Sequence, residues 1–342
     1  MESGGKASAP PEVRDHFSQD TSNAGARATR VTARPPMPPR FLELIPPNLG
    51  VDFVRLAPPM IAVSIVAILI GLASIALRGG LNYGIEFVGG TMVQVRFPRA
   101  TPIVDVRAAL AREDLREVAV QEVGRDSTEF QVRVHGAEKG EFAAASAVRA
   151  RLSEKFGEGS YDILRVDAVG PKVGKALWRD AALAVVAATL MMGAYIWFRF
   201  DVRFGICAAV ALAHDVLVAI GALSLTNMEF DLTTVAALLT VVGFSVNDTV
   251  IISDRIRENL AKMRRERLAS VINVSINETL SRTIITNGTA ILVTAVLFVL
   301  GGNVIHSFAF TLLVGFIAGT YSSIFIACPL VLAMEGRGRK RN

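Results

Sequence analysis

The sequence has few of the residues on which disulfide-bonded, zinc-binding or hydrolytic proteins depend. Its 342 residues include only 2 cysteines, Cys207 and Cys328, and both lie within long apolar stretches. This pattern gives neither a disulfide framework nor a CxxC zinc motif. The 4 histidines form no HExxH motif, and no GxSxG motif is present. The sequence therefore indicates no metal site and no other cofactor.

A P-loop is also missing, although one glycine-rich segment looks similar to it. The segment VGPKVGKA has three residues between Gly170 and Gly174, whereas a P-loop has four between its glycines. Ala176 follows Lys175, where a P-loop has Ser or Thr. The sequence therefore does not support nucleotide hydrolysis, and we do not expect the chain to be an enzyme.

Apolar residues, in contrast, are abundant and gathered in long runs. They make up 51% of the chain. A membrane-spanning helix needs roughly 20 mainly apolar residues. Six runs meet or approach this length, so we predict an all-α bundle of six membrane helices. The runs are Met60–Leu77, Ala181–Phe198, Phe204–Leu225, Leu232–Ser253, Ile284–Leu300 and Phe308–Met334.

The basic residues predict the orientation of these spans. Short cytoplasmic loops are enriched in Lys and Arg. Basic residues lie between spans two and three, between spans four and five, and in residues 335–342, whereas Thr226–Asp231 and Gly301–Ser307 contain none. Both termini are therefore expected in the cytoplasm and residues 78–180 on the outer side. We expect the basic termini to contact membrane lipid and not nucleic acid.

The residues before the first span contain no pattern of a packed domain. Residues 1–40 are rich in Gly, Ala, Ser and Pro, and we predict that they are a disordered cytoplasmic tail. Residues 41–59 are predicted to be a juxtamembrane segment. No cleavable signal is evident, so the run at 60–77 is interpreted as an uncleaved anchor.

Residues 78–180 change to the periodicities of a small α+β domain. Two helices and four strands alternate in the order β-α-β-β-α-β, which is the ferredoxin-like arrangement. The predicted strands are Thr91–Phe97, Val118–Val123, Phe130–Val134 and Tyr161–Val169, and the predicted helices are Pro102–Glu113 and Glu141–Phe156.

Ionisable residues within or beside the spans are the strongest functional signal. A charged side chain at mid-helix costs about 2.5–3.5 kcal/mol on insertion scales. Asp248 lies in span four and Arg282 begins span five at a similar depth, so the two can pair. His214 and Asp215 lie near the middle of span three. An acid placed between a positive partner and apolar surroundings is a candidate for proton exchange near physiological pH.

Structural interpretations of the same residues stay open. Asp248 and Arg282 can form a static ion pair, and His214 and Asp215 can be a buried polar pair that only fixes packing. Residues 254–283 are predicted to form a cytoplasmic helix with a solvated, charged face. The spacing of Gly315 and Gly319 is a GxxxG pattern, which favours close helix packing.

Several segments resemble, in the same order, those of the bacterial SecF family. The most specific is GFSVNDTVIISDRIREN (residues 243–259), which is similar to the family's fourth membrane segment. Five others extend the resemblance over about residues 41–335. They are LNYGIEFVGGT after the first span, VGPKVGKAL before the second, ALAHDV in the third, NETLSRTIIT before the fifth and GTYSSIFIACPL at the end of the sixth.

Two positions depart from the family pattern. Glu86 stands where the family usually has Asp, and Phe244 stands where Tyr is common. The glycines of these segments are family-motif residues, and those near the start of the outer domain are candidate hinges. The motif glycines are Gly84, Gly89, Gly90, Gly170 and Gly174, and the candidate hinges are Gly79–Gly80, Gly84 and Gly89–Gly90.

The resemblance implies a role in protein export. SecF is the smaller half of the SecDF complex, which works beside the Sec channel SecYEG and its accessory subunits on unfolded exported polypeptides. The resemblance also implies a membrane part similar to half of an RND-type transporter, SecD as the partner, and protons as the driving ion. In the family, the Asp of the NDT segment and the Arg before span five are linked to proton passage. They correspond to Asp248, next to Asn247, and Arg282. The implied location is the bacterial cytoplasmic (inner) membrane, with residues 78–180 in the periplasm.

Two other functions remain open at this point. Half of an RND-type small-molecule exporter would move drugs or lipids, although the single small outer domain argues against it. A passive scaffold of the Sec channel would need no proton exchange, so changes at Asp248 and Arg282 would be silent.

Overall fold

The computed structural model describes residues 50–111, 118–123, 126–134 and 141–338. The predicted tail at 1–40 and the last residues, 339–342, lie outside the described residues. All described residues belong to one compact unit, Leu44–Asn342.

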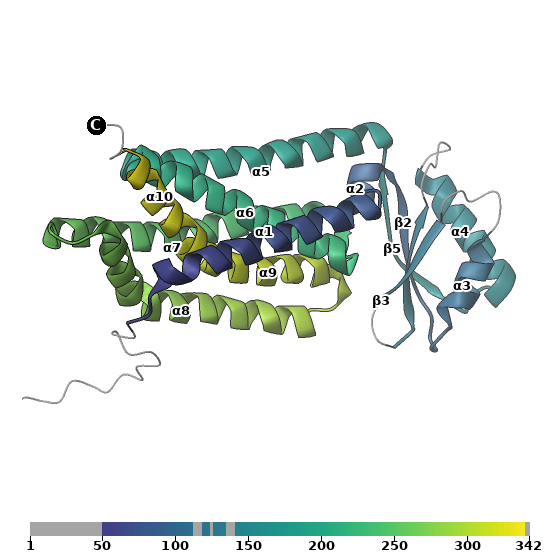
Figure 1. The fold of residues 1–342 in the computed structure, drawn as a ribbon. Helices are drawn as coiled ribbons and strands as arrows, with labels where there is room; N and C mark the ends of the chain where they lie inside the picture. Colours follow the sequence, from purple (N-terminus) through teal and green to yellow (C-terminus); the bar gives the residue numbers. More distant parts are fainter. Residues whose placement is uncertain (1–49, 112–117, 124–125, 135–140, 339–342) are drawn as a thin grey trace, which may run out of the picture. The chain divides into compact units, whose positions relative to one another are not determined.

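Six candidate membrane spans are present within the described residues, as the apolar runs predicted. Five of them are the continuous helices α1 (Phe53–Leu77), α5 (Pro171–Arg199), α6 (Val202–Thr226), α7 (Leu232–Lys262) and α8 (Leu268–Leu300), shown in Figure 1. The sixth follows a short 3₁₀ helix, η1 (Asn303–Ile305). It consists of α9 (His306–Ser322), the π-helix η2 (Ser323–Ala327) and α10 (Cys328–Gly338).

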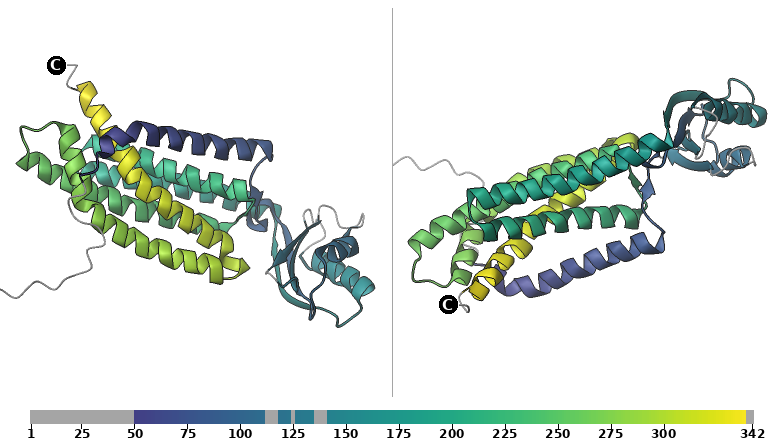
Figure 2. Two further views of the ribbon diagram at one scale, coloured as in Figure 1. Left: turned by 60° about the horizontal axis from the view of Figure 1, so that its bottom comes forward. Right: turned by 90° about the horizontal axis from the view of Figure 1, so that it is seen from above.

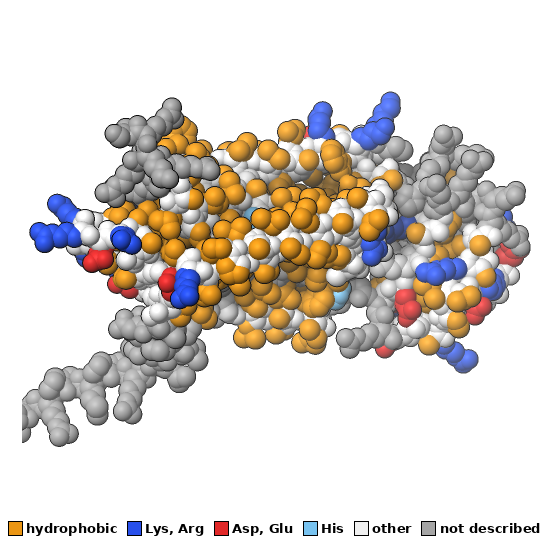
Figure 3. Space-filling view, viewed as in Figure 1, with side chains coloured by type: hydrophobic (Ala, Val, Ile, Leu, Met, Phe, Trp, Pro, Cys, Tyr) orange, Lys and Arg blue, Asp and Glu red, His pale blue; other side chains and the backbone are white. Residues whose placement is uncertain are grey.

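Three spans form the interior of the bundle and three lie at its edges. In their most apolar windows, α6, α7 and the sixth span are 56% buried, whereas α1, α5 and α8 are 11–17% buried. Figure 2 shows α1 and α5 at opposite edges of the bundle. Hydrophobic side chains cover the helices on the face shown in Figure 3, as a lipid-facing surface requires.

Glycines let the interior helices approach closely. A Cβ atom on Gly315 would lie 2.1 Å from Cγ2 of Val241, so the GxxxG segment packs directly on α7. Gly71 on α1 faces Gly221 on α6, where an added Cβ would lie 2.7 Å from the Gly221 Cα. The predicted close packing at Gly315 and Gly319 is confirmed, and an equivalent glycine contact joins α1 to α6.

The helices of the structure differ from two predicted boundaries. Helix α1 begins at Phe53, inside the predicted juxtamembrane segment 41–59, after the N-cap Asp52, which accepts a hydrogen bond from the Arg55 amide at 3.0 Å. The predicted helix 254–283 is interrupted between Lys262 and Leu268. The chain reverses direction between these two residues, so that α7 and α8 pack side by side. Asn259 on α7 donates hydrogen bonds to Ser275 and Glu278 on α8.

The outer domain has the predicted ferredoxin-like arrangement. Its sheet has the antiparallel order β3 (Val118–Val123), β4 (Glu129–Val134), β2 (Gly90–Arg96) and β5 (Asp162–Val169). Helices α3 (Ile103–Leu110) and α4 (Glu141–Phe156) cover one face of the sheet (Figure 1). Alternate residues of the strands point into this core, and Val93, Val95, Phe130 and Val132 are fully buried.

A short parallel pair joins the outer domain to the loop between spans three and four. Strand β1 (Asn82–Tyr83) pairs with β6 (Glu229–Phe230), and helix α2 (Ile85–Val88) follows β1. The rings of Tyr83, Phe87 and Phe230 pack together with centroids 5.5–6.4 Å apart. Aromatic contacts and strand pairing therefore hold the outer domain on this loop.

Candidate functional site

A buried carboxylate lies among three helices of the bundle. Asp248 on α7 is 1% exposed, and its Oδ2 accepts a hydrogen bond from Nδ2 of Asn287 on α8. The same Nδ2 atom donates to Oγ1 of Thr320 on α9 at 2.6 Å. We call Asp248, Thr283, Asn287 and Thr320 the Asp248 centre.

Three oxygen atoms of the Asp248 centre have no hydrogen-bond partner among the described residues. They are Asp248 Oδ1, Thr283 Oγ1 and Asn287 Oδ1. Thr283 and Asn287 are each 1% exposed and, being four residues apart, share one face of α8. A buried polar atom without a partner costs about 1–3 kcal/mol, and such atoms are rare in proteins. The chemistry of this centre therefore suits the uptake of a proton or a water molecule.

Arg282 does not make the direct ion pair with Asp248 that the sequence predicted; within the described residues no such pair is present. Helix geometry explains this result, because Arg282 lies about 140° around α8 from Asn287, the residue that contacts Asp248. Arg282 is exposed and lines a hollow of about 700 Å³, together with Arg199, Asp254 and Thr279. It interacts with Asp248 through its charge alone. Asn247, beside Asp248, is exposed on α7.

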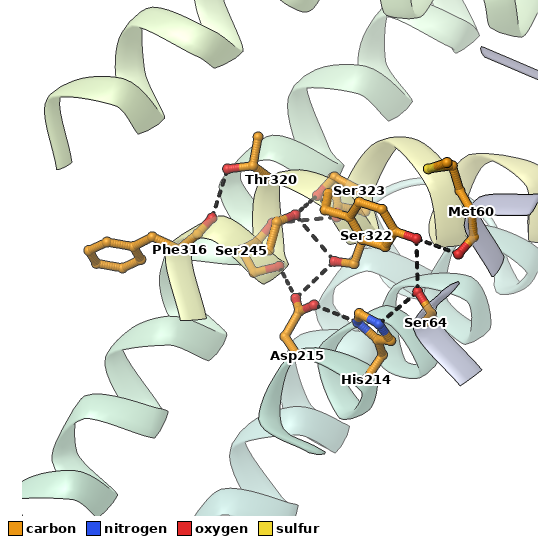
Figure 4. Close-up of polar contacts among 12 residues, drawn as sticks. Met60, Ser64, His214, Asp215, Ser245, Phe316, Thr320, Ser322 and Ser323 are labelled. Carbon is orange, nitrogen blue, oxygen red and sulfur yellow. Dashed lines mark hydrogen bonds and ion pairs between the residues drawn. The ribbon is translucent and has the colours of Figure 1, made fainter. Parts of the chain in front are cut away.

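His214 and Asp215 form a second buried polar group, shown in Figure 4. His214 Nδ1 lies 2.9 Å from Asp215 Oδ1, and His214 Nε2 lies 3.1 Å from Ser64 Oγ on α1. Asp215 Oδ2 accepts hydrogen bonds from Ser245 on α7 at 2.6 Å and from Ser322 on α9 at 2.9 Å. We call these five residues and Tyr321 the His214 centre. It joins α1, α6, α7 and α9.

Four consecutive hydroxyl residues lie on the sixth span at Thr320–Ser323, and the first three belong to the two centres. Thr320 belongs to the Asp248 centre, whereas Ser322 contacts Asp215 and Tyr321 contacts α1. Ser323 Oγ lies 3.2 Å from Oγ1 of Thr249 on α7. Successive residues point about 100° apart on a helix, so one short segment can reach several neighbours. The π-helix that begins at Ser323 precedes Pro329, which has no amide hydrogen to continue a regular helix.

A third polar cluster lies outside the membrane spans, where the outer domain meets β6. Arg133 on β4 is 5% exposed and forms an ion pair with Glu229. Its guanidinium also donates to Gln121 at 3.2 Å and to Asn82 at 3.4 Å. This buried ion pair connects the sheet to the loop between spans three and four.

Carboxylates crowd the same junction and are partly desolvated. Burial raises the pKa of Glu229 to about 7, although the charge of Arg133 opposes this effect. Burial also raises the pKa of Glu86, whose Oε2 has no hydrogen-bond partner among the described residues. Both residues line a cavity of about 160 Å³ with Asp167 and Asp231. No group of three or more His, Cys, Asp or Glu side chains suited to a metal ion occurs in the part of the chain that the structure describes.

The family-motif glycines lie around this junction. Gly89 and Gly90 have φ values of +80° and +138°, which favour glycine. Gly84 caps α2, and an added Cβ would meet Glu86 Oε2 at 2.3 Å. On α5, a Cβ on Gly174 would lie 2.7 Å from the Phe87 carbonyl oxygen, whereas Gly170, the N-cap of α5, has open space. These glycines permit tight turns and close packing of α5 on α2.

Sequence reasoning missed several residues that complete these clusters. Asn287 follows the NETLSRTIIT segment directly, and an amide inside an apolar span was the available signal. Ser64 is a single polar residue in an apolar run and gave no local signal, whereas Tyr321 lies in the run of hydroxyl residues Thr320–Ser323. Arg133 and Glu229 are 96 residues apart, so no spacing rule could pair them.

Comparisons with known proteins agree with this architecture. The family model "Protein export membrane protein SecD/SecF, C-terminal" matches residues 148–337, and "SecD/SecF GG Motif" matches residues 76–97. The chain is 44% identical over 293 residues to "Protein translocase subunit SecF" of Desulfurispirillum indicum, covering 84% of this chain and 92% of the relative. It is 45% identical over 292 residues to the subunit of the same name in Magnetococcus marinus, covering 85% of this chain and 94% of the relative.

Solved structures give the same result. The crystal structure of SecDF, a translocon-associated membrane protein from Thermus thermophilus, aligns with a TM-score of 0.76 at 34% identity. The alignment covers 88% of this chain and 40% of that chain, so the chain spans about two fifths of the solved protein. A SecDF structure in a super-membrane-facing form aligns with a TM-score of 0.60. These matches confirm the resemblance predicted from the sequence motifs.

Proposed function

Because this chain belongs to the SecF family of protein translocase subunits, we propose that it uses the proton-motive force, together with SecD, to promote late steps of protein export. SecF is a transport protein, and this family is not one of catalytic enzymes. The observation that carries the proposal is the Asp248 centre, where a buried carboxylate has an oxygen without a hydrogen-bond partner among the described residues.

Asp248 is the proposed proton carrier. Asn287 holds Oδ2 in place, so Oδ1 is the atom available to load and release a proton. Arg282 supports release, because its positive charge favours the ionised carboxylate. One charge that crosses 100 mV releases about 2.3 kcal/mol. This amount is sufficient to bias two conformations that differ by a few kcal/mol.

A proton that leaves Asp248 needs a path that is accessible to water. The hollow of about 700 Å³ is lined by Val250, Thr279 and Arg282, which lie close along α7 and α8 to Asp248 and Thr283. The lining is mainly charged, and the loop between α7 and α8 carries several basic residues. By the positive-inside rule this end faces the cytoplasm. The hollow therefore suits the cytoplasmic end of a proton path.

The surface chemistry of α7 suits contact with SecD. Large apolar residues cover the lipid-facing sides of α5 and α8, for example Leu190 at 62% exposure and Leu292 at 65%. After Leu232, which is 40% exposed, the exposed face of α7 carries small and polar residues as far as Asn247, a pattern typical of helix–helix contact in membranes. These residues are Thr233, Ala236, Thr240, Gly243 and Asn247. Asn247 would thus lie where SecD could complete the proton path.

The rest of the assignment follows the family. His214 and Asp215 are proposed as part of the proton pathway, and Gly79, Gly80 and the pair Gly89–Gly90 as hinges of the outer domain. We place the chain in the bacterial cytoplasmic membrane with both termini inside and residues 78–180 in the periplasm. There the outer domain would contact the unfolded exported polypeptide, beside SecYEG and its accessory subunits.

The test compares Asp248→Asn with a control variant in vesicles that contain SecD and the Sec channel. Asp248→Asn should retain complex assembly but lose the export gain that depends on the proton gradient. Asp180→Asn on α5 is the control, because Asp180 is exposed, does not line the hollow and pairs with Arg179 at 3.0 Å. An undiminished gain in Asp248→Asn would rule the proposal out and leave the passive scaffold. Proton-driven efflux of small molecules without any effect on export would instead favour an RND-type exporter.

A further inference from the structure

We propose that His214 is a proton-dependent link between the bundle and α1, with Ser64 and Tyr321 as its positioning residues. The inference rests on the proposed function, since it takes the pair His214–Asp215 to exchange protons. It adds a route by which a change in the protonation of this pair can affect the outer domain. The route is α1, because α1 ends at Leu77 and leads through Gly79 and Gly80 into that domain.

The hydrogen bonds of Ser64 fix the role of His214 in the observed arrangement. Ser64 Oγ donates to the Tyr321 hydroxyl at 3.1 Å, and Tyr321 in turn donates to the Met60 carbonyl oxygen. A serine hydroxyl has one proton, and here that proton is already used. His214 Nε2, at 3.1 Å from Ser64 Oγ, must therefore be the donor in their contact.

The other side of the pair holds a second proton. Asp215 Oδ2 already accepts from Ser245 and Ser322, so Oδ1 faces His214 Nδ1 at 2.9 Å. A lone pair on Nδ1 would repel an ionised Oδ1, so one proton must lie between these two atoms. The observed arrangement thus contains one proton on Nε2 and one shared with Asp215, and the pair is neutral overall.

Loss of one proton from this pair changes the contact with α1. The remaining proton stays between Nδ1 and Asp215, because that position avoids repulsion with the carboxylate. Nε2 then becomes an acceptor, and it can bind Ser64 only if the Ser64 hydroxyl turns away from Tyr321. The bond from Ser64 to α9 is lost and the bond from Ser64 to α6 reverses direction. Proton release therefore loosens α1 from the sixth span.

At their described contacts, His214 and Asp215 face hydroxyl groups and no other carboxylate, histidine or basic side chain. The groups that face the pair are the hydroxyls of Ser64 from α1, Ser245 from α7, and Ser322 and Tyr321 from α9, and among these Tyr321 alone is titratable. Directly after α1, Arg78 donates to the Leu225 carbonyl oxygen of α6 at 3.3 Å. Farther along α1 itself, two contacts with α6 are Gly71 with Gly221 and Ser74 with Ser224 at 2.9 Å. Neither of these contacts contains an ionisable side chain.

The order Ser64–His214–Asp215 also resembles a serine-hydrolase triad, but the geometry excludes that role. Ser64 is 4% exposed and its hydroxyl proton is directed to Tyr321, whereas a nucleophile donates its proton to the histidine. The arrangement suits a link between helices and not attack on a substrate.

Nitrogen NMR of the complete complex with SecD, labelled with ¹⁵N-histidine and placed in lipid vesicles, tests the link directly. The spectrum of His214→Gln assigns the His214 signals, because the chain has only 4 histidines. We expect both ring nitrogens to be protonated at acidic pH and Nδ1 alone at alkaline pH. A single tautomer and charge state from pH 5 to 9 would overturn the proposal.

The functional test measures the pH profile of proton-dependent export in vesicles. Ser64→Ala removes the acceptor of the Nε2 proton and should move the midpoint of the profile by about one pH unit toward acid. Ser74→Ala, the matched control on α1, should leave the midpoint unchanged, and Ser64→Thr should restore it. Equal midpoints in Ser64→Ala and Ser74→Ala would contradict the inference.

The two proposals can fail separately. A retained gain in Asp248→Asn refutes the proposed function. A fixed His214 spectrum, with the gain lost in Asp248→Asn, refutes only the link through α1. If Ser64→Ala does not assemble, the wild-type His214 spectrum still decides the matter.

Discussion

Replacing Glu229 by Gln should make the outer junction more stable at alkaline pH but not at acidic pH. The Glu229 side chain is 18% exposed and lies in the carboxylate-rich junction beside Arg133. Burial raises its pKa from 4.5 to about 7. A group with a raised pKa binds its proton more tightly in the folded protein, so its stabilising effect is complete below pH 4.5 and is lost as pH rises through 7.

The size of the effect follows from the two pKa values. Each pH unit between them corresponds to about 1.4 kcal/mol, which gives an upper limit of about 3 kcal/mol at pH 8. The wild type and Glu229→Gln should differ by less than about 0.5 kcal/mol at pH 4.5, because Glu229 is then neutral in the folded protein and only about half ionised in the unfolded chain. At pH 8 the Gln variant should be the more stable protein.

Thermal unfolding of the purified protein in detergent, at pH 4.5, 6 and 8, measures this difference. We expect the midpoint of Glu229→Gln to exceed that of the wild type by several degrees at pH 8 and by almost nothing at pH 4.5. Asp105→Asn is the control, because Asp105 is an exposed carboxylate on α3 of the same domain. A wild type that gains stability over Glu229→Gln as pH rises would show that the Arg133 pair, and not burial, dominates at Glu229.

Two further substitutions test the packing. Gly71→Ala should lower the free energy of unfolding by about 1–3 kcal/mol, because its Cβ would lie 2.7 Å from the Gly221 Cα and force α1 away from α6. Gly288→Ala, with no atom within 4 Å of the new Cβ, should be neutral or stabilising by up to about 1 kcal/mol, and equal losses in both would refute the close-contact explanation. Asn227 ends α6 with φ +56°, so Asn227→Ala should cost about 1 kcal/mol relative to Asn227→Gly in the same denaturation assay. If the Ala variant matches the Gly variant, the left-handed backbone at Asn227 is not a source of strain.

Hydropathy and periodicity predicted the architecture because both signals are local. The apolar runs located the spans, since lipid imposes a minimum length on each helix. The alternation of Val93 and Val95 with polar neighbours located β2, and the order of elements then gave the sheet topology. Helix ends were less certain, because residues such as Phe53 and Leu268 lie in polar sequence that continues the helices beyond the apolar runs.

The composition of the polar centres could not be predicted in the same way. Asp248 and Arg282 were recognised as charges at a similar depth, but the rotation of α8 decides that Asn287, and not Arg282, contacts Asp248. The contact between Ser64 and His214 joins residues 150 positions apart. Such contacts depend on how complete helices pack, which local residue patterns do not encode.

The proposed mechanism depends most directly on the charge state of one side chain, Asp248. Infrared difference spectroscopy of the complex with SecD, in which the Asp248→Asn spectrum is subtracted, measures that state as pH changes. We expect a protonated carboxyl band of Asp248 at acidic pH that is replaced by a carboxylate band before pH 9. A side chain that keeps one charge state over the whole range would contradict proton coupling and leave Asp248 as a structural contact between α7 and α8.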